Sequence, residues 1–446
     1  MMEMIPVKSM LIAHPGGPLR GEIELPGDKS ISHRAVIFGA LADGESVIHH
    51  LLEGEDVLRT VAAFQAMGVA ARRTDAGVWH LRGVGLEGLS EPEDVLDMGN
   101  SGTGMRLLAG LLAGQPFFSV LTGDESLRSR PMGRVAIPLA RMGARILGRN
   151  QNRYAPLAIQ GTELTGIEYV SPVASAQVKT ALLLAGLNAA GRTVVSEPAL
   201  SRDHTERMLA AYGVGLERHG LTVAVTGGAR LRGVALTVPG DISSAAFPMV
   251  AALLVPDSDV TLRGVGINPT RTGLLDLLLM MGADITLENQ RDDGGEPVAD
   301  LRVRHSRLHG IQVPPEVVPR AIDEFPVFAL AAACAVGETV VTGAEELRVK
   351  ESDRIQAIAQ GLGRQGADIE ELPDGMRIRG NPGGLAGGAR AEAYGDHRIA
   401  MTLMVAGLAA RRAVTVTGRA NVETSFPGFG TTMATLGGRI EQRTEE

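Results

Sequence analysis

The chain repeats one pattern of polar and hydrophobic positions six times. A short polar segment opens an apolar run of helical length, as in GDKSISHRAVIFGALA and NSGTGMRLLAGLLA, and these starts fall near residues 27, 100, 175, 240, 323 and 396. Each run is followed by a short strand-like segment such as ETVVTG, and then by a second helical segment that ends in glycine, such as FQAMGV. Glycine readily ends a helix in the left-handed conformation. The pattern therefore predicts six units of helix, strand, helix and two strands.

A longer repeat divides these six units into two halves. The segment LRGEIELPGDKS at 19–30 is echoed by LRGVALTVPGDISS at 231–244. Repetition alone is also compatible with a solenoid. Two halves joined by two crossings explain why the strongest echo falls once in each half. We therefore predict two similar α/β domains of three units each, residues 28–239 and residues 1–27 plus 240–446, with crossings near 25–28 and 238–241.

Length and charge narrow the class of protein. A chain of 446 residues is too long for one ordinary core. A net charge of −8 without any Lys/Arg-rich run argues against nucleic acid as a partner. No apolar run reaches the roughly 18 residues that span a bilayer, and the start lacks the pattern of a signal peptide. We expect a cytoplasmic protein that binds neither membrane nor nucleic acid.

Several kinds of site are not indicated. The single cysteine, Cys334, lies in an apolar helical run and excludes a disulfide framework or a cysteine-based zinc site. No pair of histidines has the spacing of metal ligands. Neither GxxxxGK[ST] nor a strand followed by GxGxxG is present, so no nucleotide-binding loop is predicted.

The polar helix starts are candidate anion sites. A helix N-terminus exposes unpaired N–H groups and carries partial positive charge, although Ser, Asn and Asp there can also act as simple caps. Capping does not explain Lys29, Arg34, Arg106 and Lys179 in the first three starts, because a cation there opposes the helix dipole. The chain has only four lysines among 43 basic residues, so Lys350 in EELRVKESDR also stands out. Further arginines lie in other predicted loops: Arg128, Arg130, Arg202, Arg354 and Arg398.

Acidic residues accompany these cations. Asp323 lies in AIDEFP, and Glu351 directly follows Lys350. Such acids can be surface residues or ion-pair partners, but a carboxylate beside a lysine is also suited to proton transfer. The residues thus predict a crevice for two small, multiply charged anions, with an acid–base set of lysine and carboxylates.

Seven motifs together resemble the 5-enolpyruvylshikimate-3-phosphate synthase family, in order from about Leu25 to Pro427. They are LPGDKSISHRA, GNSGTGMRLL, RPMGR, SAQVKTALLLAGL, AIDEFP, LRVKESDR and GDHRIAM. The wording of SAQVK, SRDHTE and NPTRTG is most similar to the bacterial class II members, many of which tolerate glyphosate. The resemblance implies two domains of three βαβαββ units in an inverse α/β barrel-like arrangement, with the active site in the interdomain cleft.

The resemblance also implies a reaction. The enolpyruvyl group of phosphoenolpyruvate passes to the 5-hydroxyl of shikimate 3-phosphate by addition–elimination through a tetrahedral intermediate, and phosphate is released. The family needs no metal or organic cofactor. We expect the protein to be a monomer, and glyphosate is a candidate inhibitor.

Site residues follow from the matching motif positions. The resemblance assigns shikimate 3-phosphate binding to Lys29, Ser30, Arg34, Ser175, Ala176, Gln177, Arg202, Asp323 and Lys350. It assigns phosphoenolpyruvate or glyphosate binding to Lys29, Asn100, Gly102, Arg130, Gln177, Glu351, Arg354 and Arg398. Lys29, Asp323 and Glu351 are the implied catalytic residues, with Asp323 as base for the 5-hydroxyl and Glu351 as the acid that protonates the methylene carbon.

The chain departs from the family pattern at a few positions. Ala176 stands where many relatives have a second serine, and Thr424 stands where class I members have a lysine. Gly102 stands where tolerant class II members often have alanine, which suggests room for glyphosate. Relatives often carry an amide at the position of Glu346, whose role the sequence leaves open.

There are two alternatives, a related enzyme and a protein of a different functional class. The related enolpyruvyl transferase that acts on UDP-N-acetylglucosamine uses a cysteine in a mobile loop near the middle of its first domain, whereas Cys334 lies late in this chain. A non-catalytic anion-binding repeat protein would not need Asp323 and Glu351 beside the cations.

Overall fold

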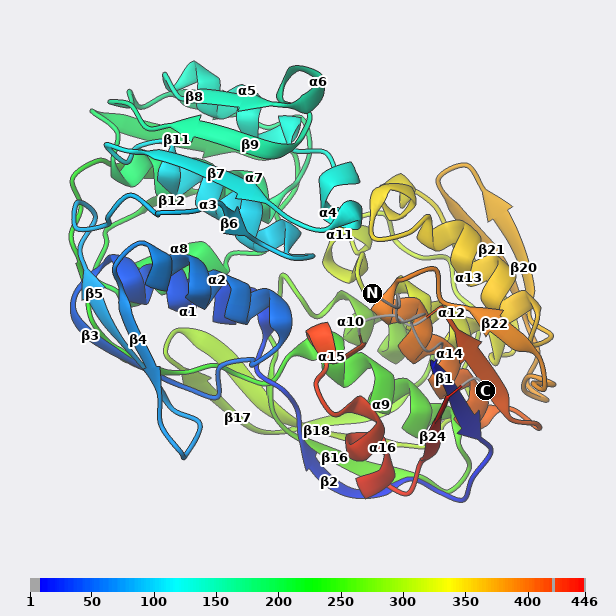
Figure 1. Cartoon of the computed structure of the whole chain (residues 1–446). Helices are drawn as coiled ribbons and strands as arrows, with labels where there is room; N and C mark the ends of the chain where they lie inside the picture. The colour runs from blue at the N-terminus through cyan, green and yellow to red at the C-terminus, as the bar shows by residue number, and fades with distance from the viewer. Residues whose placement is uncertain (1–8, 419–421, 445–446) are drawn as a thin grey trace, which may run out of the picture. The chain divides into compact units, whose positions relative to one another are not determined.

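A computed structural model describes residues 9–418 and 422–444 of the chain (Figure 1). By their internal contacts, the residues form two compact units. The first, which we call the 27–239 unit, contains Gly27–Pro239 together with Asp292–Glu296. The second, the 240–446 unit, contains Gly240–Arg291, the residues from Pro297 onward and the segment that ends at Pro26. That residues 28–239 form one domain, and residues 1–27 plus 240–446 the other, stays a prediction.

Three copies of the helix, strand, helix and two-strand pattern make up the 27–239 unit. The first copy is α1 (Lys29–Leu41), β3 (Ala42–His49), α2 (Glu55–Ala66), β4 (Ala70–Arg73) and β5 (Trp79–Val84). The second is α3 (Gly102–Leu112), β7 (Phe118–Thr122), α5 (Gly133–Arg141), β8 (Arg145–Gly148) and β9 (Tyr154–Gln160). The third is α7 (Ala176–Leu187), β11 (Arg192–Ser196), α8 (His204–Ala211), β12 (Glu217–His219) and β13 (Thr222–Thr226). Two short segments, α4 (Glu125–Ser129) and α6 (Arg149–Asn152), lie in the connections of the second copy.

Each copy forms its own sheet. The three strands pair antiparallel in the order first, third, second, as in β3-β5-β4. A short strand from outside the copy pairs in parallel with the first strand. These edge strands are β6 (Leu96–Asp97), β10 (Glu168–Val170), β14 (Leu231–Arg232) and β15 (Ala235–Thr237). Because β14 and β15 follow the third copy and pair with β3, they tie the end of the unit to its beginning.

The 240–446 unit repeats this arrangement. Its fourth copy is α9 (Ile242–Leu254), β16 (Asp259–Gly266), α10 (Gly273–Met280), β17 (Asp284–Asp293) and β18 (Glu296–Arg304). Its fifth is α12 (Phe325–Ala333), β19 (Gly337–Val341), α13 (Arg354–Gly363), β20 (Asp368–Leu372) and β21 (Gly375–Gly380). Its sixth contains α14 (His397–Ala409), β23 (Val414–Thr417), α16 (Phe429–Thr435) and β24 (Arg439–Thr444). The remaining elements are β2 (Arg20–Glu24), α11 (Val318–Ala321), the 3-10 helix η1 (Glu345–Val349), β22 (Arg390–Glu392) and α15 (Val422–Ser425).

The sixth copy differs from the predicted pattern. In it β24 is the second strand, and β1 (Ser9–His14) from the beginning of the chain takes the place of the third strand. This strand pairs antiparallel with both β23 and β24, giving the sheet order β22-β23-β1-β24. The two ends of the chain are therefore joined in one sheet, a pairing that no local sequence pattern could indicate.

The sequence echo corresponds to equivalent edge strands. β2 pairs in parallel with β16, as β14 and β15 do with β3. After β2 the chain enters α1, and after β15 it enters α9. Each echo is thus an edge strand of one unit followed by the first helix of the other.

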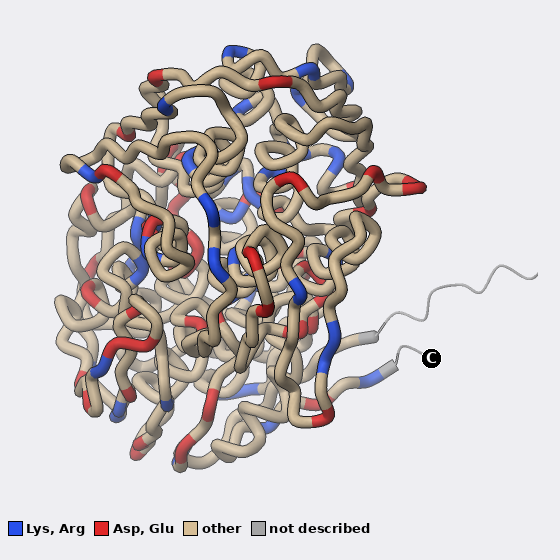
Figure 2. Tube along the Cα trace, turned by 90° about the vertical axis from the view of Figure 1, so that its left-hand side faces the viewer, with Lys and Arg blue, Asp and Glu red and all other residues tan. Residues whose placement is uncertain are grey.

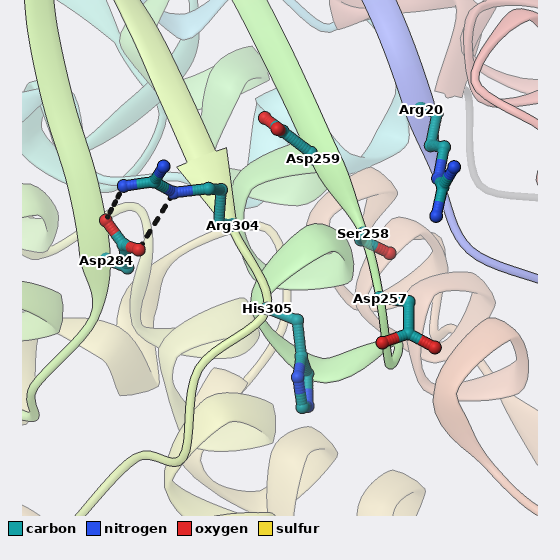
Figure 3. Close-up of a pocket in the computed structure, with 7 residues that line it drawn as sticks. All are labelled: Arg20, Asp257, Ser258, Asp259, Asp284, Arg304 and His305. Atoms are coloured by element: carbon teal, nitrogen blue, oxygen red, sulfur yellow. Dashed lines mark hydrogen bonds and ion pairs between the residues drawn. The ribbon is translucent and has the colours of Figure 1, made fainter.

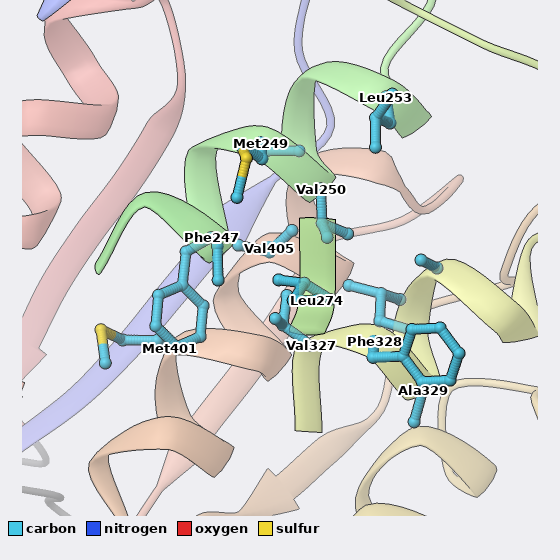
Figure 4. Close-up of a cluster of buried hydrophobic side chains, with 14 of the residues drawn as sticks. Phe247, Met249, Val250, Leu253, Leu274, Val327, Phe328, Ala329, Met401 and Val405 are labelled. Atoms are coloured by element: carbon cyan, nitrogen blue, oxygen red, sulfur yellow. The ribbon is translucent and has the colours of Figure 1, made fainter. Parts of the chain in front are cut away.

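The first helix of each copy forms the core of its unit. In the 27–239 unit α3 packs against α7 and α1, and in the 240–446 unit α9, α12 and α14 pack against one another. Figure 1 shows α1 next to β3 and β5, and α3 next to β7. These helices are apolar on nearly all sides after their first turn, as expected of helices buried between other elements. Figure 4 shows part of the second core, where Phe247 and Val250 of α9, Phe328 of α12 and Val405 of α14 are buried.

The strands show why the sheets lie outside the helices. In β9, Ala155, Leu157 and Ile159 are buried while the residues between them are exposed or partly exposed. This alternation is typical of an antiparallel sheet with one face on a core and one toward water. The described residues form six separate sheets, none of which closes into a barrel. No helix in the described ranges is both long and apolar enough to cross a membrane.

Candidate functional site

Three helix starts of the 27–239 unit carry most of the predicted residues. Asp28 caps α1 by accepting from the Ile31 N–H at 2.9 Å, Ser101 caps α3, and Ser175 caps α7. The predicted residues Ser30, Gly102, Ala176 and Gln177 follow within two positions of these caps. Each start therefore has both a capping residue and further N–H groups that can bind an anion, because a cap uses only part of the N–H groups of the first turn.

Lys29 opens α1 and forms an ion pair with Asp56 of α2. The lysine side chain is 23% exposed and that of Asp56 only 7%. Asp56 was missed in the sequence, where an acid in the first turn of α2 was indistinguishable from an ordinary partner of the helix dipole. A ligand that binds Lys29 must share its ammonium group with this carboxylate.

Arg34 ties three predicted segments together. Its guanidinium donates to the Ser30 carbonyl at 2.9 Å, to Thr180 Oγ1 at 2.8 Å and to Thr205 Oγ1 at 2.7 Å. Arg202 donates to Ser30 Oγ at 3.4 Å. Burial lowers the pKa of Arg34 to about 10, which still leaves it charged at neutral pH. Two arginines therefore lie at the start of α1 and favour an anion there.

Asn100 links the start of α3 to α4. Its Oδ1 accepts from Arg130 Nη2 at 2.6 Å, and its Nδ2 donates to Asp124 Oδ2 at 2.7 Å. Asp124 also caps α4 through Leu127 N–H. The sequence indicated Asn100 and Arg130 but not Asp124, which orients the amide of Asn100 so that its oxygen faces the arginine.

Gln177 is held by two residues of α3. Its Oε1 accepts from Arg106 Nη1 at 2.6 Å, and its Nε2 donates to Thr103 Oγ1 at 2.9 Å. The opening turns of α3 and α7 are therefore joined by side chains. Ala176, beside Gln177, contributes no hydroxyl at this place.

Lys179 does not line the third helix start. Its ammonium is buried between Glu197 Oε2 at 2.8 Å and Glu206 Oε1 at 2.7 Å, and the side chains of all three residues are 3% exposed. The sequence grouped Lys179 with the anion-site cations because it lies four residues after Ser175. Lys179 lies about one helical turn beyond Ser175, and its side chain is in the interior instead.

His33 joins α1 to the cap of α3. Its Nδ1 lies 2.9 Å from Thr60 Oγ1 and its Nε2 lies 3.4 Å from Ser101 Oγ. Burial, reinforced by the charges of Lys29 and Arg34, holds the pKa of His33 well below 6.5. The ring is therefore neutral in the folded protein at neutral pH.

A pH-dependent loss of stability follows from this histidine. Below pH 6.5 the unfolded chain takes up a proton at His33 while the folded protein does not, so stability present above that pH is lost as the pH falls. Between pH 6.5 and 5.5 we expect the parent to lose about 1 kcal/mol more unfolding free energy than His33→Asn. Urea unfolding at both pH values measures this difference. His219→Asn, at an exposed position, is the control and should match the parent; equal losses in His33→Asn and the parent would contradict the assignment.

In the 240–446 unit, Lys350 lies between two carboxylates. Its Nζ is 3.5 Å from Asp323 Oδ1 and 3.3 Å from Glu346 Oε1. The side chains of Lys350 and Asp323 are 21% and 16% exposed, whereas that of Glu346 is 44% exposed. The structure thus gives Glu346 a contact with Lys350, which the sequence had left without a role.

Arg354 is the buried centre of this group, with 1% of its side chain exposed. Its guanidinium contacts Asp323 Oδ1 at 3.4 Å, Glu351 Oε2 at 2.7 Å and Asp396 Oδ2 at 2.8 Å. Burial alone would lower the pKa of Arg354, but the surrounding carboxylates raise it above its usual value. The predicted acids are therefore ion-pair partners of this arginine, and they remain within reach of any ligand that it binds.

Asp396 was not predicted, although it holds two predicted residues. Its carboxylate pairs with Arg354 and also caps α14 by accepting from Arg398 N–H at 2.9 Å. Arg398 Nη1 lies 3.6 Å from Glu324 Oε1, and Glu324 also accepts from the Ser243 hydroxyl. The sequence signal for Asp396 was its position before a polar helix start, the same position that Asp28 and Asp241 occupy.

Other features do not join either group. Thr424 is buried in α15 and brings no positive charge to its position. Figure 3 shows a pocket of the 240–446 unit lined by Arg20, Asp257, Ser258, Asp259, Asp284, Arg304 and His305. In it Arg304 and Asp284 pair with each other at 2.9 Å, and no predicted site residue is among the lining residues.

The charged residues in the structure are mixed in sign, as the composition of the sequence indicates. Along the part of the chain that the structure describes, Figure 2 shows Lys and Arg positions interspersed with Asp and Glu positions. Among these residues no group of three or more His, Cys, Asp or Glu could hold a metal ion. Each unit thus presents a small set of cations backed by carboxylates, which suits binding of multiply charged anions and transfer of protons.

Comparison with known proteins places the chain in one family. A family model described as EPSP synthase (3-phosphoshikimate 1-carboxyvinyltransferase) matches residues 13–433. A protein named 3-phosphoshikimate 1-carboxyvinyltransferase from Magnetococcus marinus is 61% identical over 97% of this chain and 99% of the relative. One of the same name from Desulfitobacterium hafniense is 57% identical over 93% of this chain and 95% of the relative.

Solved structures agree with the predicted fold. EPSP synthase from Acinetobacter baumannii is 48% identical and superposes with a TM-score of 0.88 over 98% of this chain and all of that one. The enolpyruvyl transferase NikO from Streptomyces tendae is only 18% identical, with a TM-score of 0.79 over 99% of this chain and all of that one, and shows the fold alone. The predicted two-domain enolpyruvyl transferase fold is confirmed.

Proposed function

Because this chain belongs to the EPSP synthase family, we propose that the two groups of residues described above bind and convert the substrates of a 3-phosphoshikimate 1-carboxyvinyltransferase. The main support for this function is the high identity to curated relatives of that name over nearly the whole chain. It confirms the predicted enzyme and favours it over transfer to UDP-N-acetylglucosamine and over a non-catalytic anion-binding protein. The substrates of the family are phosphoenolpyruvate and shikimate 3-phosphate.

The start of α1 is the proposed phosphate-binding part for shikimate 3-phosphate. Arg34 donates to the Ser30 carbonyl and Arg202 donates to the Ser30 hydroxyl, and two arginines beside one residue suit a phosphate dianion. The start of α7 adds Ser175, Ala176 and Gln177 to this site. Lys350 and Asp323 are proposed to bind the ring hydroxyls. Lys29 is proposed to reach both substrates.

The second anion is proposed to lie on another set of cations. Arg130 with Asn100 and Gly102 in the 27–239 unit, and Arg354 with Arg398 in the 240–446 unit, are proposed to hold phosphoenolpyruvate. The chain has Thr424 where class I members supply a further lysine, so the positive charge around phosphoenolpyruvate is proposed to come from these arginines and Lys29. That both groups act on one pair of substrates stays a prediction, which a structure with both substrates bound would test.

The proposed chemistry uses two carboxylates. Asp323 takes the proton of the 5-hydroxyl as its oxygen bonds to carbon 2 of phosphoenolpyruvate, while Glu351 gives a proton to carbon 3, so that a tetrahedral ketal forms. In the second step the bond from carbon 2 to the phosphate oxygen breaks, carbon 3 loses a proton to Glu351, and phosphate departs with the proton that Asp323 had taken, so that both carboxylates are regenerated. Asp323 and Glu351 both contact the Arg354 guanidinium, which places base and acid in one ion-pair network. Cations held in fixed positions stabilise the charge that develops on the leaving phosphate.

An assay of phosphate release tests the function directly. We expect release from phosphoenolpyruvate with shikimate 3-phosphate as acceptor and none with UDP-N-acetylglucosamine. Release only with the nucleotide sugar would favour the related transferase. No release with either acceptor would leave the non-catalytic alternative.

Gly102→Ala is expected to weaken binding of glyphosate and of phosphoenolpyruvate. A Cβ at this position would lie 3.0 Å from Arg106 Nη1, so this guanidinium, which holds Gln177, must shift by a few tenths of an ångström, and it would lie 3.4 Å from Arg130 Nη1, in close van der Waals contact. We expect the inhibition constant of glyphosate to rise about tenfold and the KM of phosphoenolpyruvate several-fold, since small displacements of charged contacts are costly. Gly430→Ala, whose Cβ would meet no atom within 4 Å, is the control. Equal inhibition constants in Gly102→Ala and the parent would refute the steric hypothesis.

We also propose that the protein acts as a cytoplasmic monomer. One chain supplies every residue of both groups, so the proposed chemistry requires no second copy. Light scattering coupled to size exclusion, at the concentration of the activity assay, tests this proposal. A dimer that loses activity on dilution would contradict it.

A further inference from the structure

Lys179 is a buried lysine close to the proposed phosphate site, and its ammonium pairs with two glutamates that are not predicted ligand residues. It lies on the second turn of α7, and its ammonium bridges Glu197, just after β11, and Glu206 on α8. Burying a lysine and two glutamates is unfavourable unless they are paired, and removing one partner leaves an uncompensated charge. Three elements are therefore held together at one point.

Glu197 connects this buried cluster to the start of α7. Its Oε2 pairs with Lys179, while its Oε1 accepts from the backbone N–H of Ser175 at 3.0 Å. Ser175 is the N-cap of α7, so this contact fixes the residue at which the helix begins. Glu206 lies on the other side of the same ammonium.

The residues next in sequence extend the connection to α1. Thr180 follows Lys179 and Thr205 precedes Glu206, and their hydroxyl oxygens lie 2.6 Å apart. Both hydroxyls accept from the guanidinium of Arg34, which also donates to the Ser30 carbonyl. The starts of α1 and α7 are thus positioned by two sets of buried polar contacts that adjoin along the chain at 179–180 and 205–206.

We propose that Lys179 is a positioning residue of the shikimate 3-phosphate site, which acts through Glu197 on the backbone of Ser175. This inference rests on the proposed role of Ser175 and Ser30 in holding that phosphate. Lys179 also neutralises Glu197, whose carboxylate would otherwise repel a phosphate bound at the start of α7. The lysine therefore supports anion binding without touching the anion.

Two matched variants separate positioning from simple stabilisation. Glu197→Ala removes one carboxylate from Lys179 and the acceptor of Ser175 N–H, whereas Glu206→Ala removes the other carboxylate and leaves Ser175 in place. For Glu197→Ala we expect the KM of shikimate 3-phosphate to rise about tenfold, with the KM of phosphoenolpyruvate within about twofold of the parent. For Glu206→Ala we expect the KM of shikimate 3-phosphate to stay within about threefold. Equal rises in the two variants, or equal rises for both substrates, would overturn the proposal.

Two conservative replacements keep the test informative if the alanine variant does not fold. Glu197→Gln keeps the length but has one acceptor oxygen, which cannot serve both Ser175 N–H and Lys179, and it should raise the KM of shikimate 3-phosphate several-fold. Glu197→Asp is one methylene too short to reach both Lys179 and Ser175 and should raise it several-fold. An unchanged KM of shikimate 3-phosphate in both Glu197→Asp and Glu197→Gln would contradict the proposed role of Glu197.

A second measurement needs no substrate. Hydrogen exchange of the Ser175 amide in the free protein should be faster in Glu197→Asp than in the parent and unchanged in Glu206→Ala. Equal exchange in Glu197→Asp and the parent would refute the positioning contact. Because exchange is independent of turnover, it separates failure of this inference from failure of the proposed function, which an inactive parent enzyme would show.

Discussion

Replacing Lys350 with arginine is expected to lower kcat/KM by about 10²-fold or more, although the positive charge is retained. The ammonium lies 3.5 Å from Asp323 and 3.3 Å from Glu346 in a place where only 21% of the side chain is exposed. A guanidinium is longer and planar, and it cannot take the position of a compact ammonium between two carboxylates. The displaced fork would push on Asp323, the proposed base. Steady-state kinetics with both substrates measures the effect.

The control for this prediction is Glu346→Gln. It removes a charge from the exposed partner of Lys350 but leaves Lys350 and Asp323 in place. Exposed ion pairs contribute little, so we expect kcat/KM within about threefold of the parent. A Lys350→Arg enzyme that retains activity within a few-fold would contradict the role of the ammonium.

Asp396→Asn is expected to reduce both stability and activity. Asp396 is fully buried and pairs with Arg354, which is itself buried. Burial alone would raise the pKa of Asp396, but Arg354 lowers it below its usual value, so the carboxylate is charged at neutral pH. Asparagine can still cap α14, but the buried Arg354 guanidinium then has one negative charge fewer beside it. Breaking a buried pair costs about 3–5 kcal/mol, so we expect a loss of unfolding free energy near the lower value.

The activity of Asp396→Asn should fall by about 10²-fold or more, because Arg354 and Arg398 both depend on this residue for their positions. Urea unfolding and steady-state kinetics measure the two effects. Ser352→Ala is the matched control, since it removes a hydroxyl hydrogen bond of 3.2 Å to the same carboxylate but no ion pair, and it should cost about 1.5 kcal/mol. If Asp396→Asn behaved like Ser352→Ala, the ion pair with Arg354 would not hold the site.

Much of the fold was predictable because the signals are local. A polar cap, an apolar helix and a glycine stop lie within a few residues of one another, and the same order recurs along the chain. The sixth copy shows the limit of this reasoning. Its sheet is completed by β1, which pairs with β24 from the opposite end of the sequence. Strand pairing at such a separation depends on how the chain folds back and has no signature in either segment.

In the candidate site, too, the sequence indicated some residues and missed others. Lys29 and Lys350 stand in polar segments, and the sequence pointed to both. Their partners Asp56 and Glu346 were missed or left without a role, because an acid in a helical first turn or a loop is ordinary. Asp396 was missed although it holds Arg354, since its local context suggests nothing beyond a cap.

The sequence by itself determined the repeats, the helix starts, the family and the reaction, because these depend on motifs of consecutive residues. Only the tertiary structure decided what each cation contacts. Lys179 and Lys29 both lie at helix starts in the sequence, yet one is buried between two glutamates and the other is partly exposed beside Asp56. A buried charge must find an opposite charge, and helix packing rather than sequence order brings that partner within reach.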